Sequence, residues 1–388
     1  MPVRPKRGWG RFVVAMFFFA ILVGLFFVPG VRPLILDSKD DLRHDLVREP
    51  PKIFPKSAEY TFTRQIQLSI SGGEDFVYTI RVPRPQTIAE QQEVSPPIVS
   101  GDPQVTSTGF YRWEETVQGD GVVLIEVRYH LTAFTHRWEI NEQSSGSIAD
   151  IPAAYKRDYL GDKWKIQPSD SDLATLARQI TGGTDNVYLA LFLIFDWMQH
   201  GPEPIFYEKQ RSWEPQDPQQ TLLGRSGDCD DQTILYASLA RSLGIPVWLE
   251  MGALFDQSQN AWGGHAWGRA FIPLKDGTGQ VVNIDLANSQ FLVRDPYRLT
   301  EWVEEGNATA LEQYYKYASF SYQSVGNIGS SQAFISQQFE PSKEQVVVTN
   351  AGQDAKVFRY LTPGFEVVTA LTAVLLVVLV SRRRRTGG

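Results

Sequence analysis

The segment that most constrains the fold runs from Arg225 to Pro246 and contains the single cysteine of the 388-residue chain. After Cys229, apolar residues recur at helical spacing, and a glycine and a proline follow the last of them. This pattern predicts a buried helix that begins beside Cys229, has Asp228 as its N-cap and ends at Gly244. The first turn of a helix presents free N–H groups and the positive end of the helix dipole, which favours a thiolate.

Three acidic residues surround this thiol: Asp228, Asp230 and Asp231. Their negative charges oppose thiolate formation, so Cys229 needs a cationic partner, such as an imidazolium, to act as a nucleophile. The alternative is that Cys229 is a small buried side chain and that the acids are ordinary residues of a helix start. The helix alone does not decide between these interpretations.

A histidine that could be the partner follows on a predicted β-hairpin. Alternating residues on both sides of a glycine-containing turn place His265 on the first strand and Asp285 at the end of the second. Gly263 and Gly264 allow the backbone before His265 to approach another element closely. A lone histidine on a strand is usually structural, but a cysteine, a histidine and a carboxylate in this chain order can perform acyl transfer through a thioester.

The segment from Gly227 to Asp231, with the helix that follows, resembles the nucleophile motif of the transglutaminase-like superfamily. His265-Ala266-Trp267 resembles the histidine motif of that superfamily, and Asp285 falls where its third residue does. The resemblance covers residues 171–291 and implies a papain-like α+β core with Cys229 as nucleophile, His265 as base and Asp285 as the residue that orients the ring. The third motif departs from the family pattern, because isoleucine rather than tryptophan precedes Asp285.

Relatives of this kind use an aromatic or amide side chain upstream of the nucleophile to help bind the oxyanion. The resemblance therefore implies such a donor, and the sequence offers Tyr207, Trp213 and Gln219 without deciding among them. The single cysteine excludes a disulfide framework and a thiolate zinc cluster. We expect no metal and no organic cofactor. His130 and His136 lack a convincing third ligand, so we interpret them as ordinary polar surface residues.

Apolar runs near both ends predict anchoring in a membrane. Residues 12–28 carry no charge and follow four basic residues, and residues 367–380 precede four arginines. Basic flanks indicate that both termini are cytoplasmic and that the main part of the chain is outside the cell. A cleaved signal peptide is the alternative for the first run, although no small-x-small cleavage site follows it. For the second, Thr362-Pro363-Gly364-Phe365 also resembles the archaeal Pro-Gly-Phe sorting signal, which implies removal of the tail and a lipid anchor.

Without the eight basic residues at the two ends, the net charge of the chain is −7 − 8 = −15. This acidity argues against a nucleic acid as partner. Alternating segments between Tyr60 and Ile140 predict a small β-domain, in which residues 60–70 and 76–82 form one hairpin and residues 110–117 and 122–130 form another. The pattern after Thr300 favours a short helix.

The expected fold class is α+β: a papain-like, transglutaminase-like core with an N-terminal all-β domain and a transmembrane helix at each end. The expected boundaries are a cytoplasmic tail (1–11), a transmembrane helix (12–31), a linker (32–59), the β-domain (60–145), the transglutaminase-like domain (146–325), a linker (326–360), a second transmembrane helix (361–381) and a cytoplasmic tail (382–388).

The expected function is that of a plasma-membrane-anchored enzyme that attacks peptide or amide carbonyls outside the cytoplasm through a Cys229 thioester. Transfer of the acyl group to water or to an amine would make it a peptidase or a transamidase. Its expected partners are a protein or peptide substrate and the lipid bilayer. The alternative is an inactive binding or structural module of the cell surface, in which the neighbouring acids keep the thiol inert.

Overall fold

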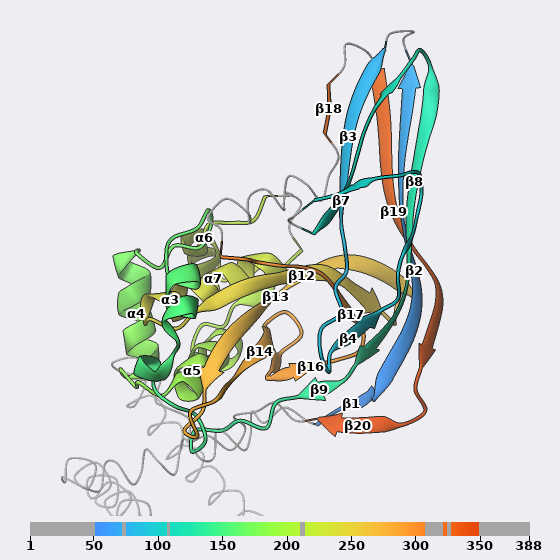
Figure 1. Cartoon of the computed structure of the whole chain (residues 1–388). Coiled ribbons are helices and arrows are strands. Elements are labelled where there is room, and N and C mark those ends of the chain that lie inside the picture. The colour runs from blue at the N-terminus through green and yellow to red at the C-terminus, as the bar shows by residue number, and fades with distance from the viewer. Residues whose placement is uncertain are drawn as a thin grey trace, which may run out of the picture. The chain divides into compact units, whose positions relative to one another are not determined.

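Two antiparallel sheets pack face to face in the computed structural model, which describes residues 51–71, 75–106, 109–209, 214–306, 321–323 and 327–348 (Figure 1). The first sheet has the order β19 (Asn327–Pro341), β2 (Ser57–Ser71), β8 (Gly121–Phe134) and β4 (Gln92–Val94), with β5 (Ile98–Val99) also paired to β8. The second has the order β18 (Ser321–Gln323), β3 (Phe76–Pro83), β7 (Phe110–Val117) and β6 (Gln104–Val105).

Alternating apolar side chains fill the space between these sheets. Along β2, Tyr60, Phe62, Ile66 and Leu68 point inward and are buried, while Glu59 points outward. The period of two places one face of each strand in the core, as expected for a β-sandwich. The predicted β-domain is therefore a sandwich of two sheets that share one hydrophobic core.

Both hairpins predicted in this region are wrong. β2 pairs with β8 and β19, whereas β3 pairs with β7 and β18, so each apparent hairpin is a crossing from one sheet to the other. Alternation shows that a strand has one apolar face, but that face can pack against a strand of the opposite sheet. His130 lies on β8 and His136 on β9, so the two histidines do not share a strand.

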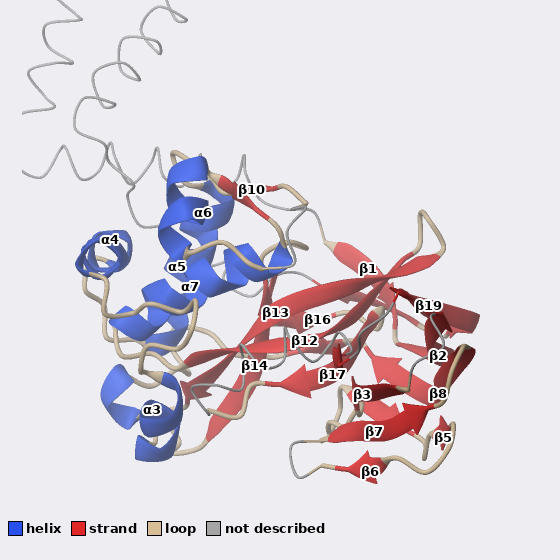
Figure 2. Ribbon diagram, turned by 90° about the horizontal axis from the view of Figure 1, so that it is seen from above, coloured by secondary structure: helices blue, strands red, loops and turns tan. Residues whose placement is uncertain are grey.

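A separate antiparallel sheet carries the candidate site and has helices packed beside it (Figure 2). Its order is β15 (Gln290–Phe291), β14 (Gly279–Asp285), β13 (Ala261–Pro273), β12 (Val247–Asp256) and β17 (Arg298–Val303). The helices are α3 (Ala153–Tyr159), α4 (Ser171–Thr181), α5 (Val187–His200), α6 (Pro218–Gly224) and α7 (Cys229–Ser242), with a 3-10 turn, η1 (Ile148–Asp150), before them. α7 packs against β12 and β13, and α5 packs against α7 and β13.

Each of the main helices begins and packs as its sequence requires. Asp170 caps α4 by accepting from two backbone N–H groups, and Asn186 caps α5 by accepting from the N–H of Leu189 at 2.9 Å. α5 is apolar nearly all round and is buried on almost every side, because it lies between other elements. The hairpin predicted around His265 is confirmed, since β13 and β14 pair from Gly268 to Pro273.

Buried polar contacts join the sandwich to the sheet that carries the site. Arg64 on β2 forms an ion pair with Glu301 on β17 at 2.6 Å, and both side chains are buried. Gln92 on β4 accepts from the backbone N–H of Thr300 at 2.8 Å and donates to its carbonyl at 3.0 Å. The hydroxyl of Tyr60 donates to the carbonyl of Pro296. These contacts hold β17 and the residues before it against the sandwich.

The predicted linkers differ from the structure. β1 (Lys52–Pro55) and the start of β2 fall within 32–59, while β19 and β20 (Gln345–Val348) fall within 326–360. β19 completes the first sheet by pairing along nearly the whole of β2, which no local pattern could indicate. Short pairs β1–β20, β9 (His136–Arg137) with β16 (Val293–Arg294), and β10 (Phe206–Tyr207) with β11 (Ser226–Gly227) complete the strands.

The described residues all belong to one compact unit, Glu49–Ala355. No helix in the described part is long and apolar enough to cross a membrane. The predicted transmembrane helices over 12–31 and 361–381 lie outside the described residues.

Candidate active site

Cys229 is the first residue of α7, and the turn before it fixes where this helix begins. Asp228 is the N-cap, and its backbone N–H donates to Oδ2 of Asp231 at 3.1 Å. Gly227 has no room for a side chain, because an added Cβ would lie 2.6 Å from the Cβ of Asp231. The helix start predicted from the sequence is confirmed, and it presents the thiol at the first turn.

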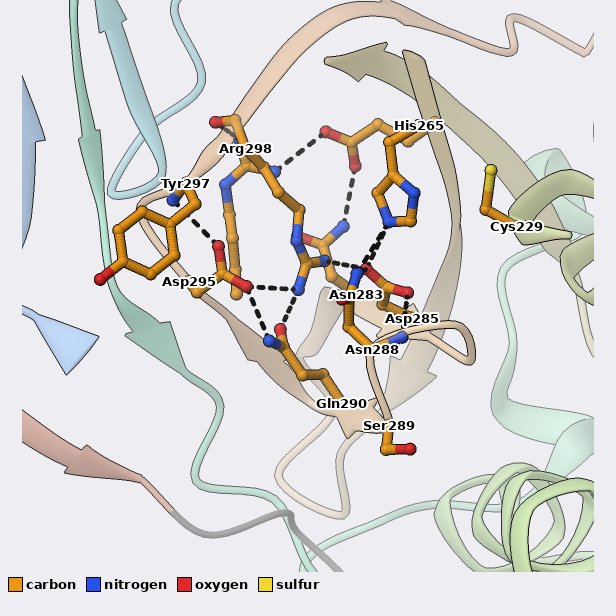
Figure 3. A network of polar contacts seen from close by, with 12 residues as sticks. Cys229, His265, Asn283, Asp285, Asn288, Ser289, Gln290, Asp295, Tyr297 and Arg298 are labelled. Carbon is orange, nitrogen blue, oxygen red and sulfur yellow. Dashed lines mark hydrogen bonds and ion pairs between the residues drawn. The ribbon is translucent and has the colours of Figure 1, made fainter. Parts of the chain in front are cut away.

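The Cys229 sulfur faces the His265 ring (Figure 3) and accepts a hydrogen bond from the backbone N–H of Ala266. Burial raises the pKa of the Cys229 thiol well above its ordinary value, and the charges of Asp230 and Asp228 raise it further. The Ala266 N–H acts in the opposite direction but is the weaker influence. The resting thiol is therefore protonated at neutral pH.

His265 and Asp285 meet across neighbouring strands of the sheet. His265 is buried on β13, Asp285 is the last residue of β14, and Nε2 of His265 lies 2.8 Å from Oδ2 of Asp285. Because Nε2 is occupied in this way, Nδ1 is the ring nitrogen left on the side of Cys229, as Figure 3 shows. The three residues singled out from the sequence therefore lie together, with the imidazole between the sulfur and the carboxylate.

Asp285 is fully buried and has two further partners. Asn288 donates its backbone N–H to Oδ1 at 3.1 Å and its side-chain N–H to Oδ2 at 2.9 Å, while Nη1 of Arg298 lies 3.1 Å from Oδ2. Burial alone would raise the pKa of Asp285, but the charges of His265 and Arg298, with hydrogen bonds from His265 and Asn288, hold it well below its usual range. Asp285 is therefore a carboxylate throughout the physiological pH range.

Neither Asn288 nor Arg298 was predicted from the sequence as part of the site. Asn288 follows Asp285 by three residues, a spacing typical of a side chain that caps a turn, and this was a usable signal. Arg298 starts β17, which pairs with β12. The helix predicted after Thr300 is wrong over the residues that end β17. Without this strand, nothing in the sequence places Arg298 near Asp285.

The structure separates the three candidate oxyanion donors. Tyr207 lies close enough to Cys229 for the thiol, Asp228 and Asp230 to raise the pKa of its phenol, after burial as the larger cause. Gln219 donates instead to Oδ2 of Asp170 at 3.1 Å. Trp213 lies outside the described residues. Tyr207 is therefore the candidate near the sulfur.

Three possible metal-ligand atoms, one each from Asp228, Cys229 and Asp230, lie within 4.8 Å of one another. The sulfur in this group already faces His265 and accepts from Ala266. A metal ion bound there would occupy the Cys229 sulfur, which already faces the imidazole and accepts the backbone N–H of Ala266. We assign no metal to this cluster.

Comparison with protein families gives two matches. Residues 174–282 match the transglutaminase-like superfamily, and residues 362–384 match the PGF-CTERM motif. The first match spans α4 to β14 and includes Cys229 and His265, while Asp285 lies just beyond it. The second supports the sorting-signal interpretation of the C-terminus and implies anchoring there at the cell surface.

Among solved structures, the chain is similar to one described as "a Putative Cysteine Protease" from Cytophaga hutchinsonii, with 17% identity and a TM-score of 0.50 over 80% of this chain and 96% of that chain. It also matches the periplasmic domain of TgpA from Pseudomonas aeruginosa, with 14% identity and a TM-score of 0.32 over 63% of this chain and 95% of that one. The first similarity supports the α+β fold. No curated protein matches the sequence significantly.

Proposed function

Since the chain carries a transglutaminase-like superfamily domain, we propose that it is a cysteine-dependent acyl transferase or peptidase, anchored at the cell surface, which acts on peptide or amide carbonyls. The observation that carries this proposal is the approach of three side chains from separate elements. The Cys229 sulfur faces the ring of His265, and the other side of that ring is bonded to Asp285 at 2.8 Å. A nucleophile, a base and an orienting carboxylate in this arrangement are the parts of covalent acyl transfer.

The raised pKa of the thiol determines how the reaction begins. Because the resting sulfur is protonated, Nδ1 of His265 accepts its proton as the sulfur attacks the carbonyl carbon. Asp285 holds the ring and stabilises the imidazolium that forms. His265 then returns the proton to the leaving amine, and the acyl group stays on Cys229 as a thioester. Water or a second amine takes the acyl group in the next step, with His265 again as base.

The developing oxyanion lies where two donors could meet it. The backbone N–H of Cys229 belongs to the first turn of α7, where N–H groups have no acceptor within the helix. The hydroxyl of Tyr207, on the short strand beside β11, would supply the second hydrogen bond. Gly263 and Gly264 are exposed next to His265, and an added Cβ at either would meet nothing within 4 Å. These glycines leave room for an extended substrate.

The location proposed for this reaction is outside the cytoplasm. The basic residues before the first apolar run favour a cytoplasmic N-terminus, and the motif match over 362–384 favours anchoring through the C-terminal segment. The C-terminus would then be cytoplasmic only in the chain whose tail has not yet been removed. The substrate would be a peptide or protein at the cell surface.

Trapping of the acyl-enzyme tests this proposal. Full-length protein is mixed with blocked peptides that contain glutamine or a labile amide, quenched in acid and analysed by intact mass. We expect an adduct on Cys229 that is absent in Cys229→Ala and that decays faster when an amine is added. Failure to find any adduct over a diverse peptide set, with the protein folded, would contradict the enzymatic function.

One observation favours a second candidate, a binding module without activity. The charges of Asp230 and Asp228 raise the pKa of Cys229 in the direction that suppresses its reactivity. In that case peptides would bind the full-length protein with equal affinity whether residue 229 is cysteine or alanine, and no adduct would form. Comparison of the two affinities with the adduct yield separates the candidates.

A further inference from the structure

We propose that Arg298 is a positioning residue of this active site, which holds the Asp285 carboxylate against His265 through a buried ion pair. In so far as it concerns catalysis, this inference rests on the proposed function. Nη1 of Arg298 lies 3.1 Å from Oδ2 of Asp285, the same oxygen that lies 2.8 Å from Nε2 of His265. Both side chains of the ion pair are fully buried, so water does not screen their attraction.

The guanidinium of Arg298 is itself held in place (Figure 3). Nη2 lies 3.1 Å from Oδ2 of Asp295 and donates to Gln290, whose own amide donates to Asp295 at 2.6 Å. The guanidinium carbon lies 5.5 Å from the centroid of the Trp267 ring, within the range of a cation–π contact. A cation fixed by a carboxylate, an amide and an aromatic ring cannot follow Asp285 if that side chain turns. It defines where Asp285 must lie.

Arg294 offers a comparison, because it is buried beside the same aromatic ring and pairs with another carboxylate, although its Nη2 also donates to the backbone carbonyl of Arg298 at 3.1 Å. Its guanidinium carbon also lies 5.5 Å from the Trp267 centroid, and its side chain is fully buried. Its carboxylate partner is Glu250, at 3.5 Å. If Arg298 served only to stabilise the fold, its loss and the loss of Arg294 would affect the site alike.

The groups that face Asp285 come from four elements. His265 lies on β13, Asn288 in the turn after β14, Arg298 on β17, and Cys229 on α7 interacts with it electrostatically. Among these groups, Arg298 is the one that stays positively charged at every pH. Its removal increases the proton affinity of the titratable groups that remain around Asp285. The ionisation of the Cys229 thiol, which controls its reactivity, must then move to higher pH.

The test uses the single cysteine of the full-length protein. The rate of Cys229 alkylation by iodoacetamide is measured against pH in wild type, Arg298→Met, Arg298→Lys and Arg294→Met, with folding checked by circular dichroism. For Arg298→Met we expect the inflections to move upward by about one pH unit or more. The lysine variant keeps the charge and should recover most of that shift, while Arg294→Met should stay within about 0.3 unit of wild type.

A double variant shows whether Arg298 acts through Asp285. Once Asp285 is asparagine, the further change Arg298→Met should alter the alkylation profile by less than about half of its effect in wild type. Equal shifts in the two methionine variants, or an unshifted profile in folded Arg298→Lys and Arg298→Met, would overturn the inference. The alkylation rate does not depend on turnover. Absence of peptide adducts in wild type would contradict the proposed function, whereas the pH profiles of alkylation test the role of Arg298 separately.

Discussion

Nε2 of His265 lies 2.8 Å from Oδ2 of Asp285, and this contact across two strands decides which ring nitrogen faces the sulfur. The strands β13 and β14 fix the histidine and the carboxylate, while α7 brings Cys229 to them. The sheet therefore holds the base and its orienting group, and the helix supplies the nucleophile.

Replacement of Asp285 by asparagine should reduce kcat/KM on a peptide substrate by roughly 10³-fold, because the amide neither stabilises an imidazolium nor fixes the tautomer. The matched control is Asp295→Asn, which removes another buried carboxylate beside Arg298 but has no contact with His265 among those that the structure gives. We expect a loss below about 10-fold for the control, because Gln290 and the Trp267 ring still hold Arg298 in place. Steady-state kinetics measure both, and equal losses would show that the charge of Asp285 has no special role.

Removal of the Tyr207 hydroxyl should lower kcat with little change in KM. A donor to the oxyanion acts mainly in the transition state, and Tyr207→Phe should cost roughly 10-fold to 100-fold, since the ring is half exposed and water can replace part of its effect. The neighbouring Phe206, which is exposed as well, gives the control Phe206→Leu, which should leave kcat unchanged. An unaltered kcat in Tyr207→Phe would exclude the hydroxyl as the second donor.

A methyl group at position 227 should damage the nucleophile turn. The added Cβ would lie 2.6 Å from the Cβ of Asp231, so Gly227→Ala must displace the start of α7 and should destabilise the fold by about 1–3 kcal/mol. Gly264→Ala is the control, because its Cβ meets nothing within 4 Å. Chemical denaturation compares the two; similar stabilities would mean that the turn tolerates the displacement.

The carboxyl of Asp231 should give the fold a recognisable pH dependence. Burial raises the pKa of Asp231 to about 6, while hydrogen bonds from the backbone of Gln216 and Asp228 act in the opposite direction. The folded state binds this proton more tightly than the unfolded chain does. The contribution of Asp231 to the free energy of unfolding is therefore fully present below pH 4 and is lost as the pH rises through 6. The stability of wild type minus that of Asp231→Asn should fall by up to about 3 kcal/mol between pH 4 and pH 7. A constant difference would contradict this assignment.

Local sequence signals located the three central residues but not their support. The cap at Asp228, the helix after Cys229 and the hairpin with His265 are all encoded within short segments, and each is confirmed. Pairing of β19 with β2, and of β17 with β12, joins segments far apart in the chain and leaves no mark in periodicity. The sequence did not indicate Arg298, because its position depends on the pairing of β17 with β12.

The most direct test of the account is whether the thiol of Cys229 depends on His265. Iodoacetamide alkylation of the full-length protein is followed against pH in wild type and in His265→Ala. We expect the rate at neutral pH to be at least about 10-fold lower in the variant, because the base is gone and the neighbouring acids still oppose loss of the thiol proton. A single ionisation that is identical in both proteins would show that sulfur and imidazole do not act together.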